Sequence, residues 1–168
     1  RTVVGNHTMF MIGSHLGHDA MVEDYVLLGN YVQIGGHGCV EHHAIISALS
    51  GTHQFVRVGR YVFTGGNTGM QRDVPPFMRV SGMYNFEVHG VNQVGLQRNG
   101  FSEDVIEQLH QVWRRLWRRR NGELFADVVA ELDARENLTE PARYLVDFIR
   151  QSNLHRFGRY RQYVHAHE

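Results

Sequence analysis

Residues 14–46 read SHLGHD-AMVEDY-VLLGNY-VQIGGH-GCVEHH-AII when the sequence is divided into groups of six. The third residue of every group is large and apolar, and this spacing extends beyond the stretch in both directions. The positions are Val4, Phe10, Leu16, Val22, Leu28, Ile34, Val40 and Ile46, continued less strictly by Thr52, Val58, Thr64 and Met70. An internal period of this kind indicates a repeat architecture.

The residues around each apolar position also repeat. Two places before it stands a small or β-branched residue, such as Thr8, Ala20 or Ala44, and the place after it is often glycine, as at Gly17 and Gly35. A triangular coil explains both features, because each short strand supplies one large inward side chain and small residues fit the corners. We expect glycine, or a residue that tolerates a left-handed backbone, where the chain turns.

Three hexapeptides would close one coil, so residue n is expected to lie beneath residue n+18, at about one strand spacing of ~4.8 Å. An amphipathic α-helix is excluded because a period of six is not a multiple of 3.6. An antiparallel sandwich would need longer strands that alternate every two residues. The sequence therefore predicts a β-solenoid, a left-handed parallel β-helix of hexapeptide repeats, over residues 1–76.

The repeat ends at Asp73-Val74-Pro75-Pro76, since proline cannot donate to a sheet ladder. We predict an irregular crossover over residues 77–100 and a C-terminal α-helical domain over residues 101–168. Apolar spacing within that domain predicts three helices and a loosely held tail: Ser102 to Asn121-Gly122, 123–135, Thr139 to Leu154, and the tail 155–168. A solenoid needs a cap at each end, and none precedes Thr2, so we expect a fragment or a short version of a longer protein.

The composition limits the partners and the cellular compartment that we expect for the protein. The formal net charge is zero and the two halves of the chain balance separately, so no nucleic-acid partner is expected. A single cysteine, Cys39, excludes an intrachain disulfide and fits a reducing compartment. No apolar run approaches the roughly 20 residues of a membrane span, and the N-terminus lacks the layout of a signal peptide. We expect a soluble, cytoplasmic protein without stable membrane insertion.

The predicted register gathers polar residues at one corner of the coil. His18 should lie beneath Gly36, and Asp19 beneath His37. The same corner should also hold His15, His53 and Gln54. Glycines there leave backbone N–H groups approachable.

These residue types suit acyl transfer. A histidine with a pKa near neutrality can take a proton from an attacking hydroxyl. Asp19 or a backbone carbonyl could hold the tautomer of that histidine, and the Gly36 N–H could stabilise an oxyanion. Two alternatives stay open. The histidines could merely occupy exposed turns, as we expect for His7 and His42-His43, or histidines on neighbouring coils could bind zinc.

Four motifs stand out along the solenoid: Gly-Ser-His15-Leu-Gly-His18-Asp19, Gly35-Gly36-His37, Gly51-Thr-His53-Gln54-Phe55, and Gly65-Gly66 through Asp73-Val-Pro-Pro-Phe77. Together they resemble one family, the acyl-carrier-protein-dependent UDP-N-acetylglucosamine O-acyltransferases of lipid A synthesis. The resemblance covers about residues 4–110. Members of the family move a (3-hydroxy)acyl chain from acyl carrier protein to the 3-hydroxyl of UDP-N-acetylglucosamine.

The resemblance implies roles for single residues. It implies His18 as the general base, Asp19 as its supporting carboxylate and Gly36 as the oxyanion donor. Gly66 matches the floor of the acyl-chain pocket. The implied substrate-binding residues are His15, His37, His53, Gln54, Asn92 and Arg98. The resemblance further implies a homotrimer with sites between protomers, no cofactor or metal, and an acyl carrier protein thioester as co-substrate.

Other functions remain open at this stage. A coenzyme-A-dependent sugar acyltransferase of the hexapeptide class would share the fold and the base, and a non-catalytic trimeric scaffold would share the fold alone. The basic stretch Arg114-Arg115 and Arg118-Arg119-Arg120 has two interpretations as well. It could be a solvated helix face, or it could steer acidic acyl carrier protein to the site.

Overall fold

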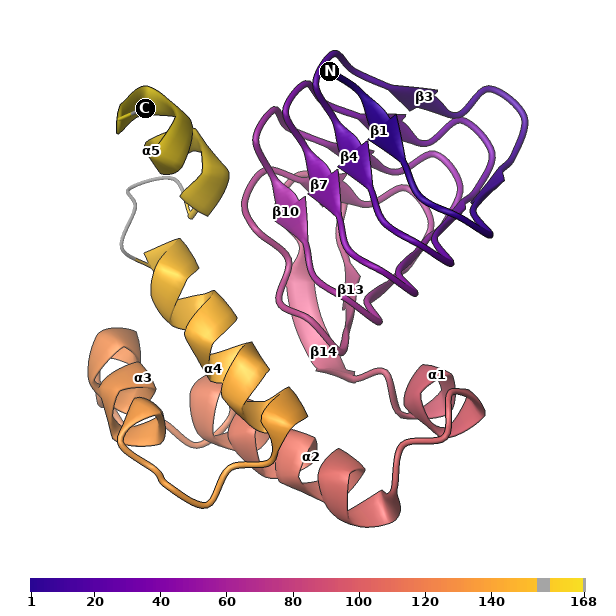
Figure 1. The fold of residues 1–168 in the computed structure, drawn as a ribbon. Coiled ribbons are helices and arrows are strands. Elements are labelled where there is room, and N and C mark those ends of the chain that lie inside the picture. The colour runs from indigo at the N-terminus through magenta and orange to yellow at the C-terminus, as the bar shows by residue number, and fades with distance from the viewer. Residues whose placement is uncertain (154–157, 168) are drawn as a thin grey trace.

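The computed structural model describes residues 1–153 and 158–167. Its N-terminal part is a left-handed parallel β-helix of four coils, the indigo to magenta stack in Figure 1. Within the described residues, twelve two-residue strands form its three faces: β1 (Val3–Val4), β2 (Met9–Phe10), β3 (His15–Leu16), β4 (Met21–Val22), β5 (Leu27–Leu28), β6 (Gln33–Ile34), β7 (Cys39–Val40), β8 (Ile45–Ile46), β9 (Gly51–Thr52), β10 (Arg57–Val58), β11 (Phe63–Thr64) and β12 (Gly69–Met70). The strand orders are β1-β4-β7-β10, β2-β5-β8-β11 and β3-β6-β9-β12.

The register confirms the predicted repeat of 18 residues per coil. Val3 pairs with Met21, Met21 with Cys39, and Cys39 with Arg57. The repeated apolar side chains point inward, and none of these five is more than 1% exposed: Val22, Leu28, Ile34, Val40 and Ile46. The fold therefore follows from the sequence period, because one large side chain per strand fills the axis of the coil.

The turns contain left-handed residues as predicted, but most of these are not the repeated glycines. The left-handed corners are held mostly by other residues, every six positions, and include Asp19 (φ 58°) and His37 (φ 57°). A Cβ on Gly35 would lie 2.7 Å from the amide nitrogen of Gln54 in the next coil. Glycine is needed there because neighbouring coils approach closely, and not because the chain turns at that residue.

Ring stacking compensates the strained corners. Non-glycine residues in the left-handed region cost about 1–3 kcal/mol each. Tyr25, His43 and Tyr61 occupy equivalent corners of successive coils, and their rings stack with centroids 4.7 Å apart. His37 and Phe55 stack in the same way at 4.6 Å. These ladders, together with corner N–H bonds to the preceding coil, offset the backbone strain.

The segment 77–100, predicted as an irregular crossover, is regular. It forms β13 (Met78–Ser81), which pairs in parallel with β11, and β14 (Glu87–Val91), which pairs antiparallel with β13. The offset falls to 16 residues, since Phe63 pairs with Arg79. The two prolines end the hexapeptide period, but the alternating buried and exposed residues of β13 can still pair with the open edge of β11.

Five helices follow in the described residues: α1 (Gln93–Arg98), α2 (Glu103–Trp117), α3 (Phe125–Asp133), α4 (Glu140–Asn153) and α5 (Tyr160–His167). The three predicted helices correspond to α2, α3 and α4, with their ends shifted by a few residues. The Ser102 hydroxyl caps α2 as predicted, because it accepts a hydrogen bond from the Val105 N–H. None of the helices in the described part of the chain is long and apolar enough to span a membrane.

The prediction of a loosely held tail over residues 155–168 is wrong for the part that forms helix α5. Residues 155–157 and 168 of that tail lie outside the described residues. The Tyr160 N–H donates to Asp73 Oδ2 at 3.0 Å, and Arg161 Nε donates to the His37 carbonyl at 3.0 Å. These acceptors precede their donors by 87 and 124 residues. The helix therefore lies against the solenoid (Figure 1) through contacts that local sequence cannot reveal.

Candidate functional site

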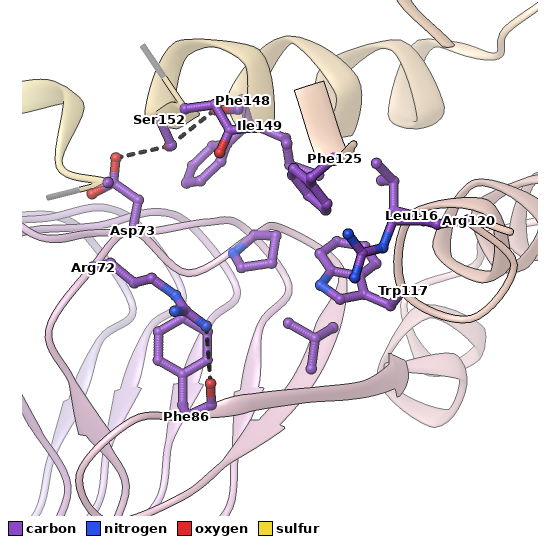
Figure 2. Close-up of a pocket in the computed structure, with 14 residues that line it drawn as sticks. Arg72, Asp73, Phe86, Leu116, Trp117, Arg120, Phe125, Phe148, Ile149 and Ser152 are labelled. Atoms are coloured by element: carbon purple, nitrogen blue, oxygen red, sulfur yellow. Dashed lines mark hydrogen bonds between the residues drawn. The ribbon is translucent and has the colours of Figure 1, made fainter. Parts of the chain in front are cut away.

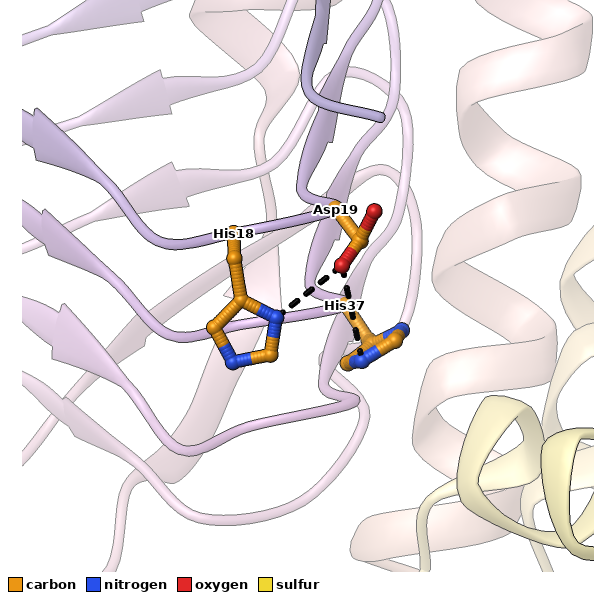
Figure 3. Close-up of side chains that lie close together, drawn as sticks. All are labelled: His18, Asp19 and His37. Atoms are coloured by element: carbon orange, nitrogen blue, oxygen red, sulfur yellow. Dashed lines mark hydrogen bonds and ion pairs between the residues drawn. The ribbon is translucent and has the colours of Figure 1, made fainter.

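The predicted corner brings three polar side chains together (Figure 3). His18 Nδ1 lies 3.0 Å from Asp19 Oδ2, and the same oxygen lies 3.9 Å from His37 Nε2. The two imidazoles meet edge to face with centroids 5.0 Å apart. His18 follows β3, and His37 lies one coil later after β6, so the register of 18 places Asp19 directly against His37. This part of the predicted site is assembled as expected.

The charges of the corner favour an ionised Asp19. The pKa of Asp19 is lowered to about 2, first by the ammonium of Arg1 and then by the hydrogen bond with His18. The Arg1 ammonium is a terminal group and is present only when Arg1 begins the chain. The hydrogen bond with His18 lowers the pKa of Asp19 whatever precedes Arg1. Desolvation lowers the pKa of His37, and the neighbouring His165 lowers it further. Asp19 is thus a carboxylate that can orient the His18 imidazole, whose side chain is 69% exposed.

Gly36 lies next to the His18 ring. A Cβ on Gly36 would be 2.7 Å from His18 Nε2, and a Cβ on Gly17 would be 2.6 Å from the Gly36 nitrogen. Glycine is therefore required at position 17, where a Cβ would meet backbone, whereas a Cβ on Gly36 would displace the His18 ring. The atom of His18 that faces Gly36 is Nε2, the nitrogen that Asp19 leaves free.

The Gly36 N–H differs from its equivalents at another corner. There, the N–H of His42 donates to Glu23 and the N–H of Arg60 donates to Glu41, both at 2.9 Å. The Gly36 N–H makes no hydrogen bond among residues 1–153 and 158–167, and the same is true of the equivalent N–H of Gln54 in the next coil. A backbone N–H without an intrachain acceptor beside an exposed histidine is the arrangement that oxyanion stabilisation requires.

The other predicted residues of this corner are exposed. His15, His53 and Gln54 all face solvent. His53 Nδ1 lies 3.0 Å from the carbonyl oxygen of Gln54, which fixes one nitrogen of the ring. Their contact with substrate stays a prediction.

Gly66 lies at a different corner from His18. The strand before Gly66 is β11 and the strand before His18 is β3, and these strands belong to different faces of the coil. A Cβ on Gly66 would meet only the Ala48 carbonyl oxygen, at 3.6 Å, so the surface there is open. A single chain therefore does not bring the predicted acyl pocket and the predicted base to one corner.

Asn92 and Arg98 stand at the two ends of α1. Asn92 is 7% exposed and caps the helix: its Oδ1 accepts from the Gly95 N–H, and its Nδ2 donates to the Tyr61 carbonyl. Both side-chain groups are thus engaged in structural contacts, and substrate binding by Asn92 would have to displace them. Arg98 is exposed in the last turn of α1.

The Arg-rich segment of α2 is partly neutralised within the chain. Arg115 Nη2 lies 2.7 Å from Glu123 and 2.5 Å from Glu131, which joins α2 to α3. Arg114 pairs with Glu107 on its own helix at 2.5 Å. These contacts favour a structural role for Arg114 and Arg115. Recognition of a carrier protein by residues 118–120 stays a prediction.

A metal ion could be held at the same corner. One ligand atom from each of His18, Asp19 and His37 lies within 4.8 Å of the other two. Two imidazoles and a carboxylate are a donor set that zinc accepts. The zinc alternative therefore remains open, with Asp19 in place of a third histidine.

A cavity of about 350 Å³ lies elsewhere, between the last coil, β14 and helices α2 to α4 (Figure 2). Its aromatic lining includes Phe86, Trp117 and Phe148. Two of its polar side chains have partners within the chain: Arg72 Nη2 donates to the Phe86 carbonyl and Ser152 donates to Asp73. The cavity belongs to the junction of solenoid and helices and not to the His18 corner.

Sequence reasoning missed two residues at the corner, both on α5. His165 packs on His37 with ring centroids 4.7 Å apart, and Arg161 donates to the His37 carbonyl. The only local signal was the i, i+4 spacing of Tyr160 and Val164, which indicates one buried helix face.

Comparison with known proteins identifies the family of the chain. A family model described as "Udp N-acetylglucosamine O-acyltransferase; Domain 2" matches residues 73–158. The chain is 40% identical over 133 residues to an acyl-[acyl-carrier-protein]–UDP-N-acetylglucosamine O-acyltransferase of Anaeromyxobacter sp. strain K, covering 79% of this chain and 51% of the relative. It is 39% identical over 155 residues to the enzyme of that name from Paraburkholderia phymatum, covering 90% and 58%.

Solved structures of proteins with the same family name have the same fold. The UDP-N-acetylglucosamine acyltransferase of Bacteroides fragilis aligns with a TM-score of 0.79 at 33% identity, over 85% of this chain and 55% of that one. The Francisella novicida enzyme aligns with a TM-score of 0.77 at 30% identity, over 87% and 52%. The chain spans about half the length of the relatives it matches. The family model, the relatives and the fold together show that the chain belongs to the UDP-N-acetylglucosamine O-acyltransferase family.

Proposed function

We propose that this chain catalyses acyl transfer from an acyl carrier protein thioester to the 3-hydroxyl of UDP-N-acetylglucosamine, as the first step of lipid A synthesis. The observation that carries the proposal is the His18–Asp19 pair beside the N–H of Gly36, which makes no hydrogen bond within the described residues. The names of the relatives supply the substrates. We further propose that the protein acts in the cytoplasm without a cofactor.

The proposed reaction begins with His18. Because Asp19 accepts from Nδ1–H, Nε2 of His18 is free to take the proton of the sugar hydroxyl. The hydroxyl oxygen attacks the thioester carbonyl carbon, and the carbonyl oxygen becomes an oxyanion that the Gly36 N–H can stabilise. The tetrahedral intermediate then collapses with cleavage of the carbon–sulfur bond. His18 returns the proton to the leaving thiolate, so acyl ester and free carrier thiol are the products.

A homotrimer is part of the proposal. Gly66 and His18 lie at different corners of the solenoid, so an acyl chain would reach both along an interface between two copies of the chain. His15, His53 and Gln54 would then line the cleft for the nucleotide sugar and the pantetheine arm, with His37 behind Asp19. Size-exclusion chromatography with light scattering tests this step, and a monomer that retains full activity would contradict it.

The experiment measures turnover of the purified chain with a 3-hydroxyacyl carrier protein and UDP-N-acetylglucosamine. His18→Ala should lose nearly all turnover while circular dichroism and oligomeric state stay unchanged. His7→Ala is the matched control, because His7 is an exposed histidine at another corner of the solenoid. An unimpaired His18→Ala protein would overturn the proposal, and a preference for acyl-coenzyme A would favour the coenzyme-A-dependent alternative.

A further inference from the structure

Helix α5 lies beyond the part of the chain that the family model matches, since that match ends at residue 158 and α5 begins at Tyr160. It nevertheless lies against the corner that contains the candidate site. A pocket of about 250 Å³ separates α5 from the solenoid and is lined by His37, Phe55, Tyr160, Arg161, Val164 and His165. One wall of this pocket is therefore the candidate site itself, through His37.

Two α5 side chains hold the helix at His37. Arg161 Nε donates to the His37 carbonyl at 3.0 Å. The His165 ring packs on His37 at 4.7 Å and on Phe55 at 5.4 Å. His37 in turn faces Asp19, which binds His18. Two residues, His37 and Asp19, thus connect the helix to the proposed base.

The charge of Arg161 is not balanced within the described chain. Its Nε is used by the His37 carbonyl, and no carboxylate lies within 4.0 Å of its guanidinium among residues 1–153 and 158–167. Arg57, Arg60, Arg115 and Arg143, by contrast, each pair with an acidic side chain. A partly buried guanidinium that has no counter-ion and keeps both terminal nitrogens available is suited to bind a phosphate.

We propose that α5 forms a phosphate-binding subsite at the edge of the candidate site, with Arg161 as the principal ligand and His165 as a second donor. The inference rests on the proposed function, whose two substrates both carry phosphate esters: the diphosphate of the nucleotide sugar and the phosphodiester of the carrier's phosphopantetheine arm. The shared chemistry is a phosphate ester, and the experiment separates the two sources.

The experiment measures binding rather than turnover, by isothermal titration calorimetry with the full chain. The probes are uridine diphosphate and 4′-phosphopantetheine, each compared with its phosphate-free counterpart, uridine and pantetheine. Arg161→Gln should weaken the binding of one phosphorylated probe about tenfold or more, the usual effect of losing a charge-assisted hydrogen bond. Arg161→Lys should restore part of the affinity, because it keeps the charge but not the planar donor pair.

Arg150→Gln is the matched control, because it removes one positive charge from an exposed site on α4. It should leave both affinities unchanged. Loss of uridine diphosphate binding would assign the subsite to the nucleotide sugar, and loss of phosphopantetheine binding would assign it to the carrier.

The proposal is overturned if Arg161→Gln changes neither affinity, if the wild-type protein binds neither phosphorylated probe, or if the phosphate-free probes weaken equally. If wild-type protein shows no acyl transfer but Arg161-dependent binding is present, the proposed function fails and the subsite stands.

Discussion

The imidazole of His18 is held by the carboxylate of its own neighbour, Asp19, with Nδ1 and Oδ2 3.0 Å apart. Adjacent residues in an extended strand point to opposite faces and would not meet. They meet here because Asp19 has a left-handed backbone, with φ of 58°, at the corner of the coil. The corner that lets the solenoid turn therefore also orients its proposed catalytic base.

Replacing Asp19 by Asn tests this orientation. The amide cannot accept from Nδ1–H with the strength of a carboxylate, and it no longer stabilises the imidazolium that forms in the reaction. We expect kcat to fall by at least about tenfold, with a smaller change in KM, because the loss is felt mainly in the transition state. Steady-state kinetics measure the split. A variant with normal kcat would show that Asp19 does not act on His18.

Two adjacent glycines should respond differently to alanine. A Cβ on Gly36 would meet the His18 side chain, which can move, whereas a Cβ on Gly35 would meet the backbone of Gln54 at 2.7 Å, which cannot. Gly35→Ala should therefore destabilise the fold by about 1–3 kcal/mol. Gly36→Ala should cost less stability but abolish most turnover. Urea unfolding combined with activity assays separates the two effects, and equal destabilisation would contradict this account.

Acid should weaken the fold through His42 and His43. Their Nδ1 atoms lie 3.0 Å apart, and desolvation lowers the pKa of both rings below 6.5. The unfolded chain then binds protons more readily, so stability is complete above about pH 6.5 and decreases as the pH falls below it. The melting temperature should drop between pH 7.5 and 5.5. His43→Gln should reduce that drop, and an unchanged pH dependence would argue against the pair.

Tyr144 links α4 to the solenoid through a buried carboxylate. Its hydroxyl donates to Glu41 Oε2 at 2.8 Å, and Glu41 is only 5% exposed. Tyr144→Phe removes a donor from this buried acceptor and should cost about 1–3 kcal/mol in the free energy of unfolding. Tyr84→Phe is the control, because Tyr84 is 78% exposed. Equal unfolding midpoints for the two variants would show that the link contributes nothing.

The sequence by itself determined the solenoid and the core of the candidate site. A period of six residues and three strands per coil set the vertical neighbours, so the pairing of Asp19 with His37 and the packing of Gly36 on His18 could be predicted before any coordinates. This works because contacts along a parallel β-helix depend on one number, the length of the coil.

Only the tertiary structure showed the contacts of the segments that lie outside the hexapeptide repeat. The pairing of β13 with β11, the capping role of Asn92 and the position of α5 on His37 all depend on partners far away in the sequence. The sequence does not distinguish the role of Gly35, because a close approach between coils and a left-handed turn both favour glycine. The local sequence pattern predicts the period and the polarity of a segment. It does not predict the surface on which a helix such as α5 packs, because burial and hydrogen bonds with distant residues determine that surface.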